Sequence, residues 1–251
     1  MFFSRLQFLK LLSCKLVKAF LPVVLVSFVS CQNLKKDNTE KPKTSNKKLE
    51  AVPSEYTEIE SAEDALNALK AGHARYMNGQ FEHIHIKRVT AEPEDEAHPF
   101  VAIITCTDLK IPTEILFDLD KQNILLMESA ANTDNGKMAS LLQSATDIQN
   151  IKLILVLGHS NCETITNIVR NKPDTSSEFI KDQIIAAIPA NRNDTLHLVE
   201  NTVLNNIKLT MNRLASKNGI IDSLTKKGSL QIKGAYYNVA TGKLIFDEDF
   251  K

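Results

Sequence analysis

The sequence has no excess charge of either sign and no apolar segment long enough for a membrane span. Its 251 residues carry 30 Lys and Arg against 30 Asp and Glu, so the formal net charge is zero. This balance, with no basic stripe of interleaved aromatic residues, argues against a nucleic-acid partner. The apolar run from Ala19 to Val29 is too short to cross a membrane comfortably, because a spanning helix needs about 20 residues.

The N-terminal segment instead has the pattern of an export signal. A basic start precedes the apolar run, and the small residue Ser30 comes directly before Cys31. The residues Phe28–Cys31 resemble a bacterial lipobox, in which the cysteine is acylated and becomes the mature N-terminus. A plain signal peptide, or an uncleaved anchor with a chance cysteine, is the alternative. We predict a lipoprotein-type signal peptide at 1–30, lipidation at Cys31, and a membrane-anchored protein on the periplasmic or surface side of the cell envelope.

The segment after Cys31 is nearly free of apolar residues. From Gln32 to about Ser54 it is rich in Lys, Asn, Thr, Ser, Glu and Pro, so it cannot bury enough surface to offset its ordering entropy. The length of the chain leaves room for one mid-sized domain plus an appendage. We therefore predict a flexible tether at 31–55 and one folded domain at 56–251.

The predicted domain alternates continuous apolar runs, which are typical of strands buried on both faces, with amphipathic segments. Strands are expected at Phe100–Ile104, Asn123–Met127, Lys152–Leu157, Ser229–Tyr237 and Lys243–Phe246. Helices are expected at Ser61–Gly79 (with a capping box of Ser61 and Asp64), Thr113–Phe117, Lys137–Ile148, Ser176–Ile188 and Thr195–Ser216. This order predicts an α/β fold whose mostly parallel central sheet is flanked by helices.

Cysteine is scarce, and the two cysteines of the predicted domain both fall near strand ends. Cys106 follows the first strand, while His159 and Cys162 follow the third. Functional side chains of parallel sheets lie beyond the carboxyl ends of the strands. Two thiolates and an imidazole suit tetrahedral Zn²⁺, with a fourth position for water or a carboxylate, and a helix beginning after Cys162 would lower the pKa of its thiol. The spacing alone leaves a Cys106–Cys162 disulfide, or two small core residues, as alternatives.

A resemblance to a known family favours the zinc interpretation. Cys106-Thr107-Asp108-Leu109-Lys110 and Gly158-His159-Ser160-Asn161-Cys162 resemble the β-class carbonic anhydrases, whose signature is Cys-x-Asp-x-Arg after one strand and His-x-x-Cys-Gly after another. The similarity extends to LKAGHARYMNGQ, IPTEILFD and GSLQIKGAYYNVATGKLIF, and it covers roughly residues 61–247.

The resemblance implies a function and a site. It implies Zn²⁺ held by Cys106, His159 and Cys162, with water or the Asp108 carboxylate as the fourth ligand. Zinc-bound hydroxide would hydrate CO₂ reversibly to bicarbonate. The family's Asp accepts a hydrogen bond from the zinc-bound water, and its Arg, here Lys110, holds that Asp off the metal. It also implies a homodimer or higher homo-oligomer.

Several catalytic positions depart from the family pattern. An ammonium at Lys110 cannot grip a carboxylate at two points as a guanidinium does, so Asp108 is free to move onto zinc and close the site. The substrate-contacting Gln that precedes the first Cys is Ala97. The family's RNAGN segment reads ESAAN and begins at Glu128, and the Gly after the second Cys is Glu163. Two added carboxylates would repel bicarbonate, unless Lys110 neutralises one of them.

Two main hypotheses follow from these residues. The first is a zinc-dependent carbonic anhydrase (a zinc lyase) of low rate, for which Asp108 and Lys110 would be the catalytic pair. The second is a catalytically impaired zinc-binding relative that serves as a binding or structural module in the cell envelope. A third possibility keeps the fold and the metal but uses another small electrophile such as COS or CS₂.

Overall fold

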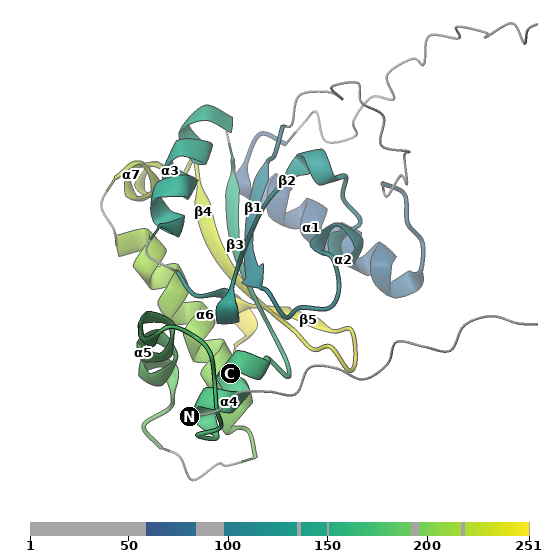
Figure 1. The fold of residues 1–251 in the computed structure, drawn as a ribbon. Helices are drawn as coiled ribbons and strands as arrows, with labels where there is room; N and C mark the ends of the chain where they lie inside the picture. The colour runs from purple at the N-terminus through teal and green to yellow at the C-terminus, as the bar shows by residue number, and fades with distance from the viewer. Residues whose placement is uncertain are drawn as a thin grey trace, which may run out of the picture. The chain divides into compact units, whose positions relative to one another are not determined.

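Five strands form one sheet in the order β2-β1-β3-β4-β5 (Figure 1). The strands are β1 (Val101–Cys106), β2 (Ile124–Ser129), β3 (Leu153–His159), β4 (Gln231–Tyr237) and β5 (Leu244–Phe246). The first four strands are parallel, and β5 pairs antiparallel with β4. The predicted α/β fold with a mostly parallel central sheet is therefore confirmed.

The computed structural model describes residues 59–83, 98–134, 137–149, 151–191, 196–216 and 219–250. All of them belong to the unit Val52–Lys251. The predicted signal peptide and tether, including Cys31, lie outside the described residues, as does Ala97, so these predictions stay predictions. Within the described ranges, none of the helices has the length and apolar character that a bilayer crossing requires.

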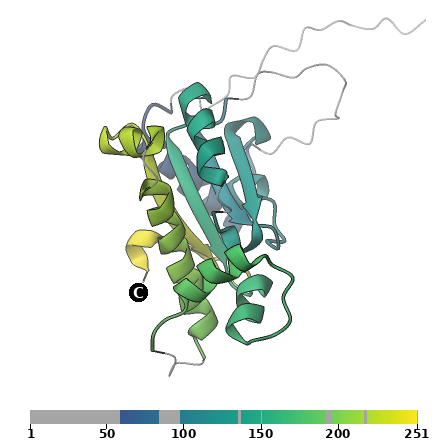
Figure 2. The same ribbon diagram turned by 60° about the vertical axis from the view of Figure 1, so that its left-hand side comes forward.

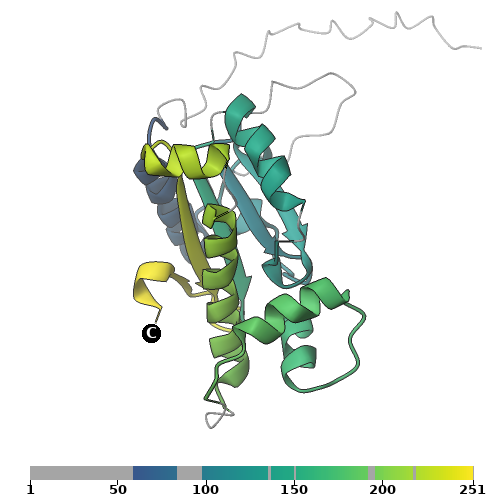
Figure 3. The same ribbon diagram turned by 90° about the vertical axis from the view of Figure 1, so that its left-hand side faces the viewer.

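Helices cover both faces of the sheet. The helices are α1 (Ala62–Asn78), α2 (Thr113–Phe117), α3 (Met138–Gln149), α4 (Glu163–Val169), α5 (Glu178–Ala187), α6 (Leu198–Ser216) and α7 (Ile220–Lys226). Short 3₁₀ turns occur at Lys121–Asn123, Ala130–Asn132 and Asp247–Asp249. α1 and α2 lie against one face, and α3, α6 and α7 lie on the other, as the turned views in Figures 2 and 3 also show.

The alternation of side chains along the buried strands divides the core into two layers. In β1, Ile103 packs with the α1–α2 layer, whereas Ile104 packs with the layer formed by α3 to α7. β3 repeats the pattern with Leu155 and Val156. Because successive side chains of a strand point to opposite faces, a strand covered on both faces must be apolar throughout.

The capping box predicted for the first helix is confirmed. The Asp64 N–H donates to Ser61 Oγ at 3.1 Å, and the Ser61 N–H donates to Asp64 Oδ2 at 2.9 Å. Further along α1, Gly72 lies against α2 so closely that an added Cβ would lie 1.7 Å from the Phe117 carbonyl oxygen. The α1–α2 layer therefore depends on a glycine at this contact.

The α6 helix also approaches the sheet at glycines. A Cβ on Gly158 of β3 would lie 2.7 Å from the Ile207 side chain, and one on Gly234 of β4 would lie equally close to Ile207 and Met211. The two bare backbones let α6 pack directly on β3 and β4. This close packing brings the middle of α6 toward the carboxyl ends of the strands.

The strands that carry the predicted ligands are longer than the sequence suggested. Cys106 is the last residue of β1 and pairs with Ser129, and His159 is the last residue of β3 and pairs with Tyr237. Both were predicted to follow their strands. The apolar pattern ended early because Thr105 is polar and Gly158 has no side chain, yet both residues keep the ladder.

Candidate metal centre

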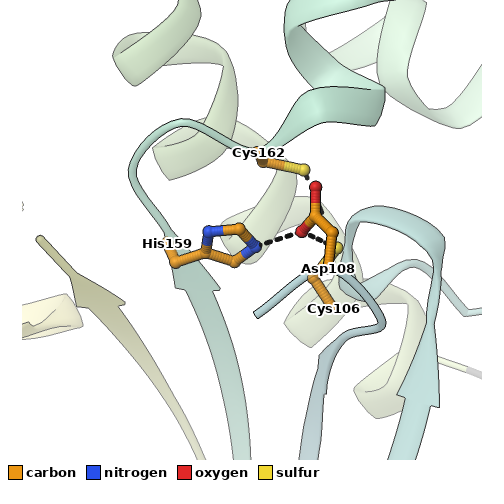
Figure 4. A group of neighbouring side chains, drawn as sticks. All are labelled: Cys106, Asp108, His159 and Cys162. Atoms are coloured by element: carbon orange, nitrogen blue, oxygen red, sulfur yellow. Dashed lines mark hydrogen bonds and ion pairs between the residues drawn. The ribbon is translucent and has the colours of Figure 1, made fainter. Parts of the chain in front are cut away.

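Four candidate ligands meet where two neighbouring strands end. Cys106 ends β1 and Asp108 lies in the turn that follows, while His159 ends β3 and Cys162 is the N-cap residue of α4. β1 and β3 are parallel neighbours, so their carboxyl ends lie side by side. Figure 4 shows the four side chains converging from these two ends. The ligand atoms of the four residues all lie within 4.8 Å of one another.

The Asp108 carboxylate lies among the other three groups (Figure 4). Its Oδ1 is 2.6 Å from His159 Nε2 and 2.8 Å from Cys106 Sγ. The two sulfur atoms, on Cys106 and Cys162, are 3.8 Å apart. Asp108 Oδ1 is thus in direct contact with two of the other three groups, the imidazole of His159 and the sulfur of Cys106.

The donor set fits Zn²⁺. Two Zn–S bonds of about 2.3 Å at a tetrahedral angle would place their sulfur atoms about 3.8 Å apart, which is the separation of Cys106 Sγ and Cys162 Sγ. His159 Nε2 is buried, and within the described part of the chain it has no partner with good hydrogen-bond angles, although Asp108 Oδ1 lies close by. Two sulfurs, one imidazole nitrogen and one carboxylate oxygen can therefore hold zinc.

Backbone groups orient three of these side chains. The His159 Nδ1–H donates to the Ser160 carbonyl oxygen at 2.9 Å, which turns Nε2 toward the cluster. The Glu163 N–H, at the first turn of α4, donates to Asp108 Oδ2 at 2.7 Å. The Ala131 N–H donates to Cys106 Sγ at 3.2 Å. The candidate ligands are consequently held by the main chain of two segments, the turn between β3 and α4 and the 3₁₀ turn Ala130–Asn132.

The close packing of these groups shifts their pKa values. Burial disfavours a charged His159, but the close Asp108 carboxylate and the Cys106 sulfur outweigh it and raise the pKa of His159 to about 10. Burial also opposes the Asp108 carboxylate, yet His159, Cys106 and the Glu163 N–H lower the pKa of Asp108 to about 2. The hydrogen bond from Cys162 is the main cause that lowers the pKa of Cys106 to about 6. Without a metal, these shifts favour a protonated His159 and negative charge on Asp108 and on the sulfur of Cys106.

The predicted lowering of the Cys162 pKa by the N-terminus of α4 is outweighed in the metal-free protein, where only the Ile165 N–H acts in that direction. The N-terminus of α4 does follow this residue, as expected, and was predicted to lower its pKa. The hydrogen bond to Cys106 and burial instead raise the pKa of the Cys162 thiol. The opposite shifts of the two pKa values favour the shared proton on Cys162 over Cys106.

Two alternatives were open for the cysteines, a Cys106–Cys162 disulfide and two small core residues, and neither describes the structure well. Cys106 and Cys162 are both free thiols, with sulfur atoms too far apart for a disulfide. Both residues are buried, but their sulfur atoms face Asp108 and His159 and not only apolar side chains.

The substituted positions around the cluster are exposed. Lys110, Glu128 and Glu163 all have solvent-exposed side chains. Throughout the described ranges, no ion pair joins Lys110 to Asp108, to Glu128 or to Glu163. The suggested neutralisation of one glutamate by Lys110 is therefore not present in the structure.

A pocket of about 700 Å³ lies between α4 and α6, beside the turn that carries His159 and Cys162. Ser160, Asn161 and Glu163 of this turn line it, but none of the four candidate ligands does. The pocket is therefore distinct from the cluster.

Sequence reasoning missed two residues of the centre, Ala131 and Asn206. Ala131 supplies the N–H that contacts Cys106, and it adopts a φ of 55°. The Asn206 Nδ2–H group donates to the Ala131 carbonyl oxygen at 2.7 Å. The signal for Ala131 was the glycine at its position in the family segment RNAGN, since glycine adopts positive φ without steric cost.

Comparisons with known proteins agree with this fold and site. The family model described as carbonic anhydrase matches residues 101–244, more than half of the chain. "Carbonic anhydrase 2" of Mycobacterium tuberculosis is 24% identical over 191 residues, which cover 72% of this chain and 90% of that protein. "Carbonic anhydrase" of Mycolicibacterium smegmatis is 25% identical over 187 residues, with the same two coverages.

Solved structures resemble the fold. A β-carbonic anhydrase of Sordaria macrospora, described as tetrameric, has a TM-score of 0.52 at 15% identity and covers 74% of this chain and 94% of its own. The Coccomyxa β-carbonic anhydrase in complex with acetazolamide has a TM-score of 0.52 at 17% identity, with coverages of 73% and 81%. Sheet, helices and cluster define an α/β protein with a candidate metal centre at the strand ends. The chain belongs to the carbonic anhydrase family, in its β class.

Proposed function

We propose that this protein is a zinc-dependent carbonic anhydrase that hydrates CO₂ reversibly to bicarbonate at a low rate. Membership of the family supports carbonate dehydratase activity in general. The observation that carries the proposal is the convergence of Cys106, Asp108, His159 and Cys162, with the sulfur separation that zinc requires.

In this proposal Cys106, His159 and Cys162 hold the metal. Bound zinc would act as a Lewis acid that brings the pKa of water close to 7. The Ser160 carbonyl oxygen fixes the imidazole so that Nε2 faces the metal position. The Ala131 N–H stabilises the charge on the Cys106 sulfur.

Asp108 has two possible tasks in this site. Its Oδ1 faces the cluster and would be available as the fourth ligand, while its Oδ2 accepts the Glu163 N–H. Turnover requires that the carboxylate leave the fourth position and accept a hydrogen bond from water there. Lys110, which is exposed and unpaired with Asp108 in the described residues, does not hold the carboxylate away. We therefore expect a low rate.

The same observation favours a second candidate function. If Asp108 stays on the metal, all four positions of a tetrahedral site are filled, and the site is structural. The protein would then be a zinc-binding module without turnover. The exposed glutamates at positions 128 and 163 would favour this outcome, because they repel bicarbonate near the site.

We also propose that the protein acts in the cell envelope, anchored through Cys31, and that it assembles as a homodimer or higher homo-oligomer. The export pattern at 1–30 supports the anchor. The tetrameric description of the Sordaria macrospora relatives supports an assembly. Globomycin-sensitive processing and acyl labelling of Cys31, and sedimentation of the purified protein, test these two points.

Zinc content and stopped-flow CO₂ hydration of the purified full-length protein test the proposed function. We expect one zinc per chain and a hydration rate above the buffer background. Cys162→Ser should lose at least about 1,000-fold in zinc affinity, since a serine hydroxyl is a poor ligand beside the remaining donors. Thr107→Ala, an exposed neighbour of two ligands, is the matched control and should keep its zinc. Full zinc occupancy with background activity would leave only the zinc-binding module, and absence of zinc would reject both functions.

A further inference from the structure

Ala131 is held in a backbone conformation that alanine rarely adopts. Its φ is 55°, in the left-handed region, and it is fully buried in the 3₁₀ turn Ala130–Asn132. The neighbouring Asn132 also has a positive φ of 48°. Side chains with a Cβ are sterically disfavoured in this region, so the surrounding structure must hold Ala131 there.

The group that holds Ala131 is the side-chain amide of Asn206. Nδ2 donates to the Ala131 carbonyl oxygen at 2.7 Å. Asn206 is fully buried in the middle of α6, and its helix neighbour Ile207 belongs to the apolar core. Its Oδ1 has no hydrogen-bond partner among the described residues. Among the described residues, the bond to Ala131 is therefore the hydrogen bond that this buried amide makes. Burial alone would favour an apolar side chain at this position.

The hydrogen bond acts on the metal centre through one residue. The N–H and the carbonyl of Ala131 belong to two successive peptide planes, and the φ and ψ of Ala131 set the angle between them. The Ala131 N–H donates to Cys106 Sγ at 3.2 Å. At the φ of 55° and ψ of 31° that Ala131 adopts in this buried turn, a carbonyl held by Asn206 therefore also restrains the direction in which the N–H points.

We propose that Asn206 is a positioning residue of the metal centre, which through Ala131 keeps a backbone N–H on the sulfur of Cys106. The proposal rests on the proposed function only in taking Cys106 as a metal ligand. α6 delivers the amide because Gly158 and Gly234 let the helix lie directly on the sheet. The helix that packs the core therefore also supports the charge of a thiolate ligand.

The structure offers a matched control on the same helix. Asn205 precedes Asn206, and its Nδ2 donates to the Ala187 carbonyl oxygen at 3.1 Å. This bond joins α6 to the end of α5, and Ala187 lies outside the turn that contacts Cys106. Asn205→Leu and Asn206→Leu each remove one side-chain hydrogen bond to a backbone carbonyl, but only the second is connected to the metal centre.

The experiment measures Zn²⁺ affinity of the full-length protein by competition with a chelator, and the thiolate-to-metal absorption band after substitution with Co²⁺. Asn206→Leu should bind Zn²⁺ about 10- to 100-fold more weakly, as supports of metal ligands generally do when removed. Its Co²⁺ charge-transfer band should shift, because the Cys106 sulfur loses its N–H partner. Asn205→Leu should match the wild type in both measurements.

A second substitution separates positioning from folding. In Ala131→Gly/Asn206→Leu, glycine adopts the required φ without steric cost, so this protein should bind Zn²⁺ more tightly than Asn206→Leu and recover most of the lost affinity. If Asn206→Leu does not fold, Asn206→Ala replaces it, with Asn205→Ala as control. A folded Asn206 variant that binds Zn²⁺ and absorbs like its Asn205 counterpart would overturn the positioning role. Failure of the wild type itself to bind Zn²⁺ would instead overturn the proposed function.

Discussion

The candidate ligands and the residues around them differ in how firmly the fold holds them. Cys106, His159 and Cys162 are buried, and hydrogen bonds to Ala131 and Ser160 orient the first two. The substituted positions of the rim, which are Lys110, Glu128 and Glu163, all have exposed side chains. The described departures from the family's catalytic pattern fall in this rim, in the turn at Ala131, and at the buried Ser129, which ends β2 and pairs with Cys106.

This difference corresponds to two separate requirements of the site, metal binding and turnover. Metal binding depends on a few donor atoms at fixed distances, which strand ends and backbone groups provide. Turnover also depends on charges around the metal, which exposed side chains can change without disturbing the core. The chain keeps what metal binding requires and alters what turnover requires. Measurements that address the two regions separately can therefore test whether the rim alone limits the rate.

The largest expected effect concerns the ligand cluster and pH. Zinc must displace the proton of His159, whose pKa is raised to about 10, and the proton of Cys162, whose pKa is also raised. Cys106 and Asp108, with pKa values of about 6 and about 2, are already ionised at pH 8. Zinc affinity should therefore rise with pH between 7 and 9, by about 100-fold per unit for about two released protons.

Calorimetry in buffers of different ionisation enthalpy counts the released protons directly. In His159→Ala the residual site should release one proton fewer, because the imidazolium is gone. A proton count near zero for the wild type would show that the metal-free centre does not hold the imidazolium and the Cys162 thiol together, and would contradict this charge arrangement.

The second effect concerns the rim. Lys110→Arg with Glu163→Gly restores the family's residues at both positions, so that a guanidinium can hold Asp108 at two points and one exposed carboxylate is removed. The hydration rate should rise about tenfold, as changes in outer-shell groups generally shift activity by this order. Stopped-flow assays at equal zinc content measure it. Lys110→Gln with Glu163→Gly, which removes the same carboxylate without adding a guanidinium, isolates the contribution of the fork.

Both rim variants should keep one zinc per chain, because Cys106, His159 and Cys162 are unchanged in them. A rim variant that loses zinc would show that the two regions are not independent. Unchanged hydration with full zinc in the arginine variant would favour the zinc-binding module over a slow enzyme.

The sequence was sufficient to predict the sheet and to single out the side chains that converge at its edge. Runs such as Phe100–Ile104 are apolar throughout, and only strands covered on both faces need that pattern. The strands' last residues were missed because a polar Thr105 and a bare Gly158 interrupt the pattern without interrupting the ladder. The short helix Ile220–Lys226 was also missed, since seven residues give too little periodicity to identify it.

The supports of the ligands were beyond prediction from the sequence for a different reason. Asn206 is one of several polar residues in α6, and its sequence position does not show that it is buried. Its burial depends on the approach of α6 to Gly158 and Gly234, which is a property of the packed structure. Ala131 supports Cys106 through its N–H, which any residue but proline would supply, so its identity carries no signal for that contact.

The smallest effect concerns the strain in the turn that supports the cluster. Ala131→Gly removes the Cβ that makes a φ of 55° unfavourable for alanine. Relief of the left-handed conformation would stabilise the protein by about 1–2 kcal/mol. Two effects oppose it: the greater freedom of glycine in the unfolded chain, about 0.5–1 kcal/mol, and the loss of a buried methyl group, up to about 0.8 kcal/mol. We therefore expect the stability of the metal-free protein in urea unfolding to stay within about 0.5 kcal/mol of the wild type. Asn161→Gly, at a φ of 60° in the ligand turn, is the control with less strain to relieve, because asparagine adopts this region more readily than alanine does. A loss of more than about 1 kcal/mol in Ala131→Gly, as the two opposing effects alone would cause, would mean that the turn is not strained at Ala131.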